Sequence, residues 1–124
     1  MAKTFRVDVV SPDQLLFSGD ATFLRAQTTA GEVGILAGHA PLFAELAAGG
    51  FVVVTLEDET KVAMAAQGGF LSVSAEAVKV LAESAQLAAE IDLAAAQAAL
   101  EASDEGSVDY YEARSRVRAA EALI

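Results

Sequence analysis

With 124 residues and no cysteine, the chain can form one domain with a hydrophobic core or a small domain with a helical appendage, and it cannot form disulfides or thiolate metal sites. Its formal net charge of -10 disfavours nucleic acid and anionic lipid as partners, because both are polyanions. No apolar stretch reaches the ~20 residues of a membrane-spanning helix and residues 1–6 hold no apolar signal segment, so we expect membrane association only through a partner.

The first two thirds of the chain have the pattern of short strands. Apolar and polar residues alternate with period two, and Gly, Pro, Ser and Asp punctuate the alternation. The clearest segments lie at 5–9, 15–17, 21–29, 33–36, 42–46, 51–56, 61–66, 70–73 and 78–81. We expect about ten short strands in a sandwich or barrel.

Turn chemistry predicts how neighbouring strands pair. Residues 51–56 and 61–66 are expected to form a hairpin, as are 70–73 and 78–81. A third hairpin is expected between 15–17 and the strand at 21–29, in which Thr22, Leu24, Ala26 and Thr28 share one face. The glycine-rich stretch 30–41 predicts a loop that contains only a very short strand.

After Glu83 the composition changes to Ala, Glu, Gln and Leu, which are strong helix formers. We therefore divide the chain into a β-sandwich domain (1–85) and an α-helical hairpin (86–124). A narrow stripe in the first helix is formed by Ile91, Ala95, Ala98 and Ala102. The stripe in the second helix is formed by Tyr110, Ala113, Val117, Ala120 and Ile124, and Asp109 with Glu112 resembles a capping box.

The predicted fold is thus a mainly β N-terminal sandwich followed by a C-terminal antiparallel two-helix hairpin. Each buried methyl or methylene group contributes only ~0.8 kcal/mol, so a contact made largely of alanine holds the hairpin weakly. An equilibrium between a docked and a released hairpin is expected.

The sequence lacks the usual signatures of catalysis. It has one histidine, no G-x-S-x-G elbow and no phosphate-binding glycine loop. His39 is either a contact residue or a surface or capping histidine. The acidic run Glu57 to Glu59 is interpreted as a solvated turn in preference to a cation site. We expect no catalytic residue, no metal and no enzymatic activity, and one histidine argues against a jelly-roll metalloenzyme.

Three cations, Arg114, Arg116 and Arg118, lie on the second predicted helix of an otherwise acidic chain. They are available to an acidic partner. Pairing within the helix with Glu112 and Glu121 is the alternative.

The run Gly31-Glu32-Val33-Gly34-Ile35-Leu36-Ala37-Gly38-His39-Ala40-Pro41-Leu42 closely resembles the epsilon subunit of the bacterial F-type ATP synthase. The segments 16–19, 68–73 and 80–83 are similar to the same family, and 90–92 and 108–110 more weakly so. The resemblance spans nearly the whole predicted sandwich.

The resemblance implies a non-catalytic rotor subunit that connects the γ subunit to the c-ring and couples proton transport to ATP synthesis. It places the subunit peripherally on the cytoplasmic side of the cell membrane and gives the hairpin a role in restraining ATP hydrolysis. The residues that it assigns to the rotor interface are Gly31, Glu32, Gly34, Gly38, His39, Ala40, Pro41 and Leu42.

The same resemblance bears on the hairpin. Ile91 and Asp92 match the family's nucleotide-binding pattern, but Ala95 stands where that pattern carries arginine. A phosphate would lack its bidentate partner, so we expect no bound ATP and no other cofactor. An extended hairpin would bring the three arginines to the catalytic β subunit. The alternative to the rotor function is a free-standing β-sandwich that binds a small ligand or a protein.

Overall fold

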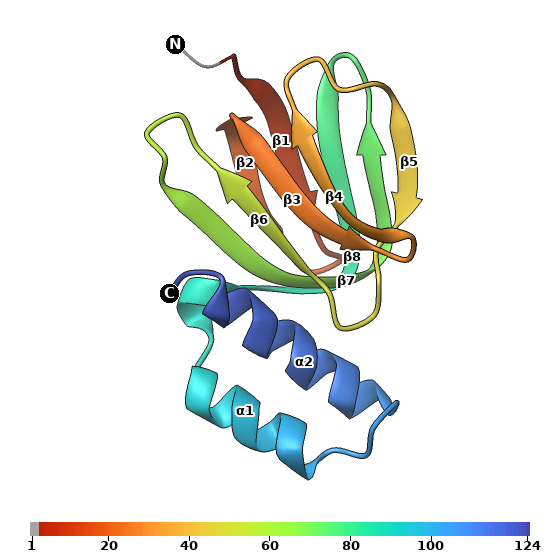
Figure 1. Ribbon diagram of the computed structural model, residues 1–124, viewed down its shortest axis with the longest axis vertical. Helices are drawn as coiled ribbons and strands as arrows, with labels where there is room; N and C mark the ends of the chain where they lie inside the picture. Colours follow the sequence, from red (N-terminus) through yellow and green to blue (C-terminus); the bar gives the residue numbers. More distant parts are fainter. Residues whose placement is uncertain (1–2) are drawn as a thin grey trace.

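The computed structural model describes residues 3–124, which form a folded sheet and a separate helical hairpin (Figure 1). The elements are β1 (Phe5–Val10), β2 (Leu15–Ala21), β3 (Phe23–Thr28), β4 (Gly31–Leu36), β5 (Leu42–Glu45), β6 (Phe51–Thr55), β7 (Lys61–Val73), β8 (Ala77–Leu87), the short 3₁₀ helix η1 (Ala88–Glu90), α1 (Leu93–Ala102) and α2 (Val108–Glu121). The predicted fold class is confirmed, although the described residues form an 8-stranded sheet rather than about ten strands.

The sheet folds over on itself into two layers because two of its strands are long. The strand order is β2-β1-β8-β7-β6-β3-β4, and β5 also pairs with β7. The first part of β7 pairs with β6 and its last part with β5, so β7 and β8 run from one layer into the other. The β1–β8 pair is parallel, whereas the other pairs are antiparallel.

The bend in β7 lies at Gly68 and Gly69, which have φ angles of 68° and 82°. A Cβ atom on Gly69 would lie 1.8 Å from the carbonyl oxygen of Leu81. The sequence pattern predicted that the strand ends at these glycines. Instead they allow it to bend and continue, and this merges two predicted strands into one.

Two further expectations about the strands were wrong. β2 pairs with β1 and not with β3, which pairs with β4 and β6. At the end of β2 the backbone N–H of Thr22 donates to the carbonyl oxygen of Thr55 at 2.8 Å, where the chain crosses to the other layer. The loop predicted over 30–41 is also shorter than expected, because β4 pairs with β3 from Gly31 onward.

The main core lies between the two layers. Of the four residues predicted to share a face, Leu24, Ala26 and Thr28 are buried, whereas Thr22 precedes β3 and is half-buried. The large side chains that are fully buried there come from both layers and include Val7, Val9, Leu24, Ile35, Leu46, Val52, Val54, Met64, Leu71 and Val80. Each contributes roughly 1.5–3 kcal/mol through burial.

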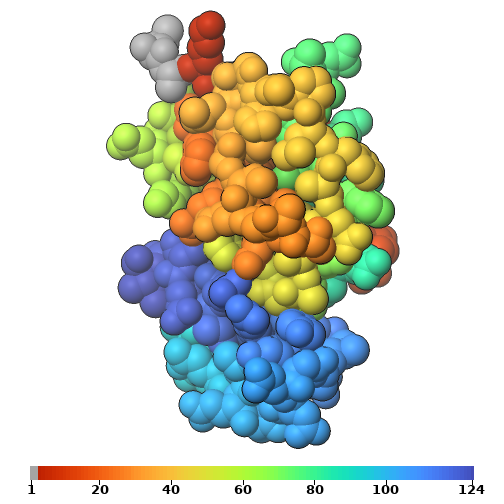
Figure 2. Space-filling model, turned by 45° about the vertical axis from the view of Figure 1, so that its right-hand side comes forward, coloured from red at the N-terminus to blue at the C-terminus, as the bar shows by residue number. Residues whose placement is uncertain are grey.

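The hairpin packs on the outside of one layer, with α2 between α1 and the sheet (Figure 1). A second apolar cluster joins them and consists of Val53, Ala63, Ala65, Ala88 and Ala119. Figure 2 shows the hairpin packed against one end of the sandwich. No helix within residues 3–124 has the length and apolar character needed to cross a bilayer.

The N-terminal cap of α2 differs from the prediction. Asp92 caps α1 by accepting from the N–H of Ala95 at 3.1 Å. Ser107, not Asp109, caps α2, and its hydroxyl oxygen accepts from the N–H of Tyr110 at 3.1 Å. The preceding Gly106 has a φ of 89°, which ends the turn and places Ser107 at the cap.

The stripe predicted for α1 was wrong, because Ala95, Ala98 and Ala102 are exposed and Ala96 is buried. Alanine occupies so many positions of this helix that periodicity could not select a face. In α2 the predicted residues Ala113, Val117 and Ala120 are buried, whereas Ile124 lies beyond the helix and is exposed. The division at residue 85 stays a prediction; β8 continues to Leu87.

Candidate functional site

The residues singled out around β4 lie at both ends of that strand. Gly31 and Glu32 form the exposed tip of the β3–β4 hairpin, and Gly34 is exposed within the strand. The exposed turn from Gly38 to Pro41 leaves the opposite end and leads into β5. Since six residues of strand span about 20 Å, these two turns are separate surfaces.

Each turn has its own supporting contacts. Glu32 Oε1 lies 3.0 Å from Arg25 Nε, and the guanidinium of Arg25 lies 5.1 Å above the ring centre of Phe51. In the other turn the backbone N–H of His39 donates to the carbonyl oxygen of Leu36 at 3.1 Å. The ring Nδ1 of His39 lies 2.6 Å from the carbonyl oxygen of Ala40. His39 is therefore a surface residue of a hydrogen-bonded turn.

An exposed row of apolar side chains crosses the outer face of the layer that the hairpin does not cover. The strand register places Phe70 beside Leu81, Leu81 beside Val10 and Val10 beside Leu15. The ring of Phe43 stacks on that of Phe70 with centroids 5.0 Å apart. The exposed fractions are 69% for Phe43, 44% for Phe70, 53% for Leu81 and 60% for Leu15, and Val10 is half-buried. We call Phe43, Phe70, Leu81, Val10 and Leu15 the apolar row.

Sequence reasoning missed the apolar row. Its signal was present where two apolar residues adjoin in a strand, as in Leu15-Leu16 and Phe70-Leu71. Adjacent strand residues face opposite sides of the sheet, so one of each pair must leave the core. A contiguous apolar patch on a soluble protein indicates a contact surface.

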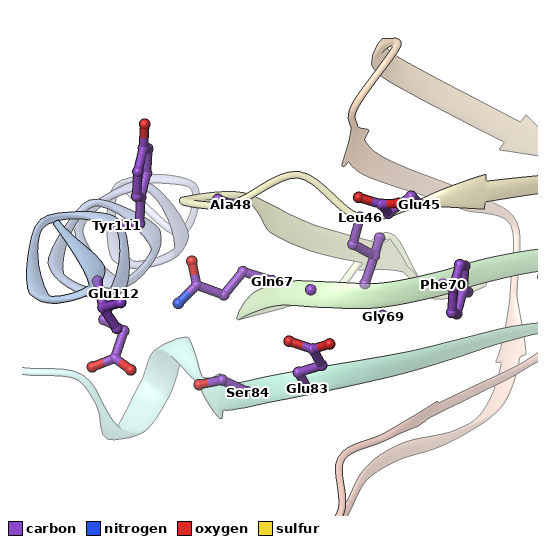
Figure 3. Close-up of a pocket in the computed structure, with 12 residues that line it drawn as sticks. Glu45, Leu46, Ala48, Gln67, Gly69, Phe70, Glu83, Ser84, Tyr111 and Glu112 are labelled. Carbon is purple, nitrogen blue, oxygen red and sulfur yellow. The ribbon is translucent and has the colours of Figure 1, made fainter. Parts of the chain in front are cut away.

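A groove of about 480 Å³ continues from the apolar row to the first turn of α2 (Figure 3). Its apolar and aromatic lining residues include Leu46, Phe70, Val108 and Tyr111. Its acidic lining residues are Glu45, Glu83 and Glu112. These carboxylates come from β5, β8 and α2, so the groove lies at the junction of sandwich and hairpin.

Polar contacts fix α2 on the sandwich beside this groove. The hydroxyl of Ser115 donates to the carbonyl oxygen of Gly50, and the guanidinium of Arg118 donates to the side-chain oxygen of Gln27. Gly49 has a φ of 72°, and a Cβ there would lie 3.2 Å from Arg114 Cδ. The contact is close because Gly49 has no side chain.

The three arginines of α2 do not form one cluster. Arg114 packs along Gly49 and Arg118 bonds Gln27, whereas Arg116 lies two residues from each and is turned toward α1. Within residues 3–124 the ion pairs are those of Arg6 with Asp8 and of Arg25 with Glu32. The structure therefore shows no ion pair between these arginines and Glu112 or Glu121 in α2, and all three arginines are half-buried.

Ile91, Asp92 and Ala95 line a separate pocket of about 280 Å³ together with Arg116. The carboxylate of Asp92 is engaged as the cap of α1. The methyl group of Ala95 offers no donor, so Arg116 is the one cation that lines this pocket.

The acidic turn between β6 and β7 is exposed, as expected for a solvated turn. Asp58 accepts a hydrogen bond from the N–H of Thr60 at 3.0 Å. Hydrogen bonds from the backbone and then the side chain of Thr60 lower the pKa of Asp58. Across the described residues 3–124, no three His, Asp or Glu side chains are grouped to hold a metal ion.

Comparison with known proteins identifies the family to which this chain belongs. Residues 4–88 match the family model of the ATP synthase delta/epsilon chain, beta-sandwich domain. The ATP synthase epsilon chain of Rhodococcus opacus is 45% identical over 93% of this chain and 94% of its own length. This chain belongs to the ATP synthase epsilon chain family. The epsilon chain of Nocardia farcinica is 42% identical over 96% of this chain and 92% of its own length.

Solved ATP synthase structures contain chains of the same fold. A chain of the Euglena gracilis mitochondrial ATP synthase, in an OSCP/F1/c-ring assembly, matches with a TM-score of 0.69 and 26% identity over 96% of this chain and 80% of that one. A chain of the Tetrahymena thermophila central stalk and c-ring matches with a TM-score of 0.62 at 16% identity, covering 99% and 98% of the two chains, and supports the fold.

The family assignment decides between the alternatives raised by the sequence. An epsilon chain is a subunit of the ATP synthase complex, so the main interpretation holds over the free-standing binding module. The family model covers β1 to β8 and therefore includes both exposed turns and the apolar row.

Proposed function

We propose that this epsilon chain is a non-catalytic rotor subunit that joins the γ subunit to the c-ring and helps couple proton transport to ATP synthesis. The observation that carries this proposal is the apolar row, which lies on the layer of the sandwich that the hairpin does not cover. A subunit buried in a stalk needs such an unpartnered face. The relative in the F1 and c-ring assembly supports the same function.

The γ subunit is the proposed partner of the apolar row. The turn from Gly38 to Pro41 leads through Leu42 directly to Phe43, so this turn and the row form one continuous surface. Burial of its exposed aromatic and leucine side chains contributes roughly several kcal/mol before the cost of association. This surface thus accounts for five residues assigned from the resemblance, Gly38, His39, Ala40, Pro41 and Leu42.

The c-ring is the proposed partner of the tip formed by Gly31 and Glu32, with Gly34 beside it. This tip is at the other end of β4, so the two partners do not compete for one surface. The paired Arg25 holds the Glu32 carboxylate in place. Torque passing between the tip and the apolar row crosses a packed core joined by ladder hydrogen bonds, which deforms little.

We assign the hairpin a regulatory role. It is docked here through alanine contacts and a few polar bonds, so its release costs little. Release would free Arg114, Arg116 and Arg118 to contact an acidic segment of the catalytic β subunit. No ATP or other cofactor is proposed to bind. The subunit would associate with the cytoplasmic side of the membrane through its partners alone.

Co-purification with the γ subunit tests the function. Replacing Phe43 and Phe70 with serine should abolish capture of epsilon by tagged γ, because the two stacked rings are the aromatic part of the apolar row. The matched control is Leu123→Ser, which removes an exposed leucine from the hairpin side. Undiminished capture of the double variant, with circular dichroism showing a folded chain, would overturn the proposal.

A further inference from the structure

The groove at the junction of sandwich and hairpin has apolar walls and acidic edges. Leu46, Phe70 and Tyr111 supply the walls. The carboxylate of Glu83 lies over Gly68, where a Cβ would be only 2.6 Å from Glu83 Oε2. The missing side chain at Gly68 therefore makes room for this carboxylate, which borders the groove (Figure 3).

Basic side chains flank the groove without lining it: Arg116 shares a small neighbouring pocket with Glu112, and Arg114 packs with Tyr111 against Gly49. No lysine or arginine is among the residues that line the groove. The ion pairs found within residues 3–124 involve neither Glu45, Glu83 nor Glu112. Elsewhere on the same face Asp8 is paired with Arg6. The groove thus offers an incoming cation carboxylates that are in no ion pair, next to apolar walls.

We propose that the groove receives a lysine or arginine side chain of the γ subunit, from the segment that covers the apolar row. This inference rests on the proposed function. Phe70 belongs both to the apolar row and to the groove, so a partner that covers the row reaches the groove opening. A long basic side chain matches the groove, because its aliphatic stem packs on apolar walls while its charged head meets the carboxylates.

A cation in the groove would also be attracted by carboxylates from both parts of the epsilon chain. Glu45 and Glu83 belong to the sandwich, whereas Glu112 belongs to α2. The cation therefore binds the docked hairpin more tightly than the released one, since release removes one carboxylate. By linkage, γ binding favours the docked hairpin.

Affinity measurements with purified γ and full-length epsilon test the groove. Glu45→Gln and Glu83→Gln should each weaken binding about fivefold at low salt and reduce its salt dependence. The matched control is Glu76→Gln, which removes an exposed carboxylate from the β7–β8 turn. It should leave the affinity for γ and its salt dependence unchanged. Glutamine keeps the size of the side chain and removes the charge.

Two outcomes separate this inference from the proposed function. If the groove variants bind γ like Glu76→Gln while the Phe43 and Phe70 double variant loses binding, the groove inference fails and the proposed function stands. If the double variant also binds normally, the proposed function fails. A Glu83→Lys variant whose binding is restored by a lysine-to-glutamate or arginine-to-glutamate change in γ would identify the partner residue.

The linkage has its own measurement. Amide hydrogen exchange in α2 should slow when γ binds the wild-type chain, and Glu112→Gln should remove most of this slowing. Equal slowing in the wild type and in Glu112→Gln would overturn the role of Glu112 in docking.

Discussion

Ser115 on α2 donates its hydroxyl hydrogen to the carbonyl oxygen of Gly50, which lies 65 residues earlier in the chain. Ser115 is only 2% exposed. A buried hydroxyl is costly without a partner, so this bond selects one position of the hairpin on a surface made largely of alanine. The docked state of the hairpin is therefore only weakly stable, but its position on the sheet is specific.

Replacement of Ser115 with alanine should shift the hairpin toward the released state. The lost hydrogen bond is worth about 1 kcal/mol, which corresponds to roughly a fivefold change in the docked-to-released ratio. Trypsin cleavage after the arginines of α2 reports this ratio. Ser74→Ala, in the β7–β8 turn, is the control. Equal cleavage rates for the two variants would show that the bond does not determine docking.

The two glycine positions Gly69 and Gly106 should respond differently to alanine. Both have positive φ, and each substitution costs about 1 kcal/mol or more from backbone strain. At Gly106 a Cβ meets nothing within 4 Å, whereas at Gly69 it meets the Leu81 carbonyl oxygen at 1.8 Å. Thermal unfolding should show a small loss for Gly106→Ala and loss of the native sandwich for Gly69→Ala. A folded Gly69→Ala chain with near-normal stability would contradict this account of the bend.

Much of the fold could be predicted because local patterns determine it. The alternation through Leu24, Ala26 and Thr28 identified a buried face, and the change in composition after Glu83 identified the hairpin. The pairing of strands was harder to predict, because β1 and β8, the first and last strands in the sequence, lie side by side in parallel. Local sequence patterns do not indicate which distant strands pair.

The candidate site was predicted only in part, for a similar reason. The exposed turns around Gly31 and Gly38 could be named from motif residues. The apolar row becomes visible only when the register places Phe70, Leu81 and Val10 side by side. The groove needs in addition the position of α2 on the sheet, which depends on contacts with distant residues such as the bond from Ser115 to Gly50.

ATP should show no saturable binding to this chain in calorimetric titration at millimolar concentration. Asp92 is engaged as a helix cap and Ala95 offers no donor, so Arg116 alone would face the phosphates. Ala95→Arg adds the missing cation at an exposed position and serves as the comparison. Saturable heat with the wild-type chain would contradict the expectation.

Acid should selectively remove a stabilising contribution from the β6–β7 turn. The hydrogen bonds from Thr60 lower the pKa of Asp58 below its ordinary value of 3.8. A lowered pKa in the folded state stabilises the fold above the unfolded pKa, and this contribution disappears as the pH falls through the folded pKa. Urea unfolding of the wild type and of Asp58→Asn should therefore differ by a constant amount above about pH 5 and converge in stronger acid. A difference that does not change with pH would rule out the ionised carboxylate as its source.

Removal of the positive charges from α2 should raise ATP hydrolysis by the assembled complex. The three arginines are half-buried in the docked hairpin, so their charges meet the catalytic β subunit only after release. A full-length chain with glutamine at positions 114, 116 and 118 tests the charges, and truncation after Ala102 tests the whole second helix. Lys61→Gln removes an exposed cation from the sandwich and is the control. Because surface charge contacts are screened, high salt should reduce the difference in hydrolysis rate between the wild type and the triple variant.

If truncation raises hydrolysis and the triple variant does not, the second helix inhibits by steric obstruction rather than by its charges. If neither change raises hydrolysis, the hairpin is not inhibitory in this complex.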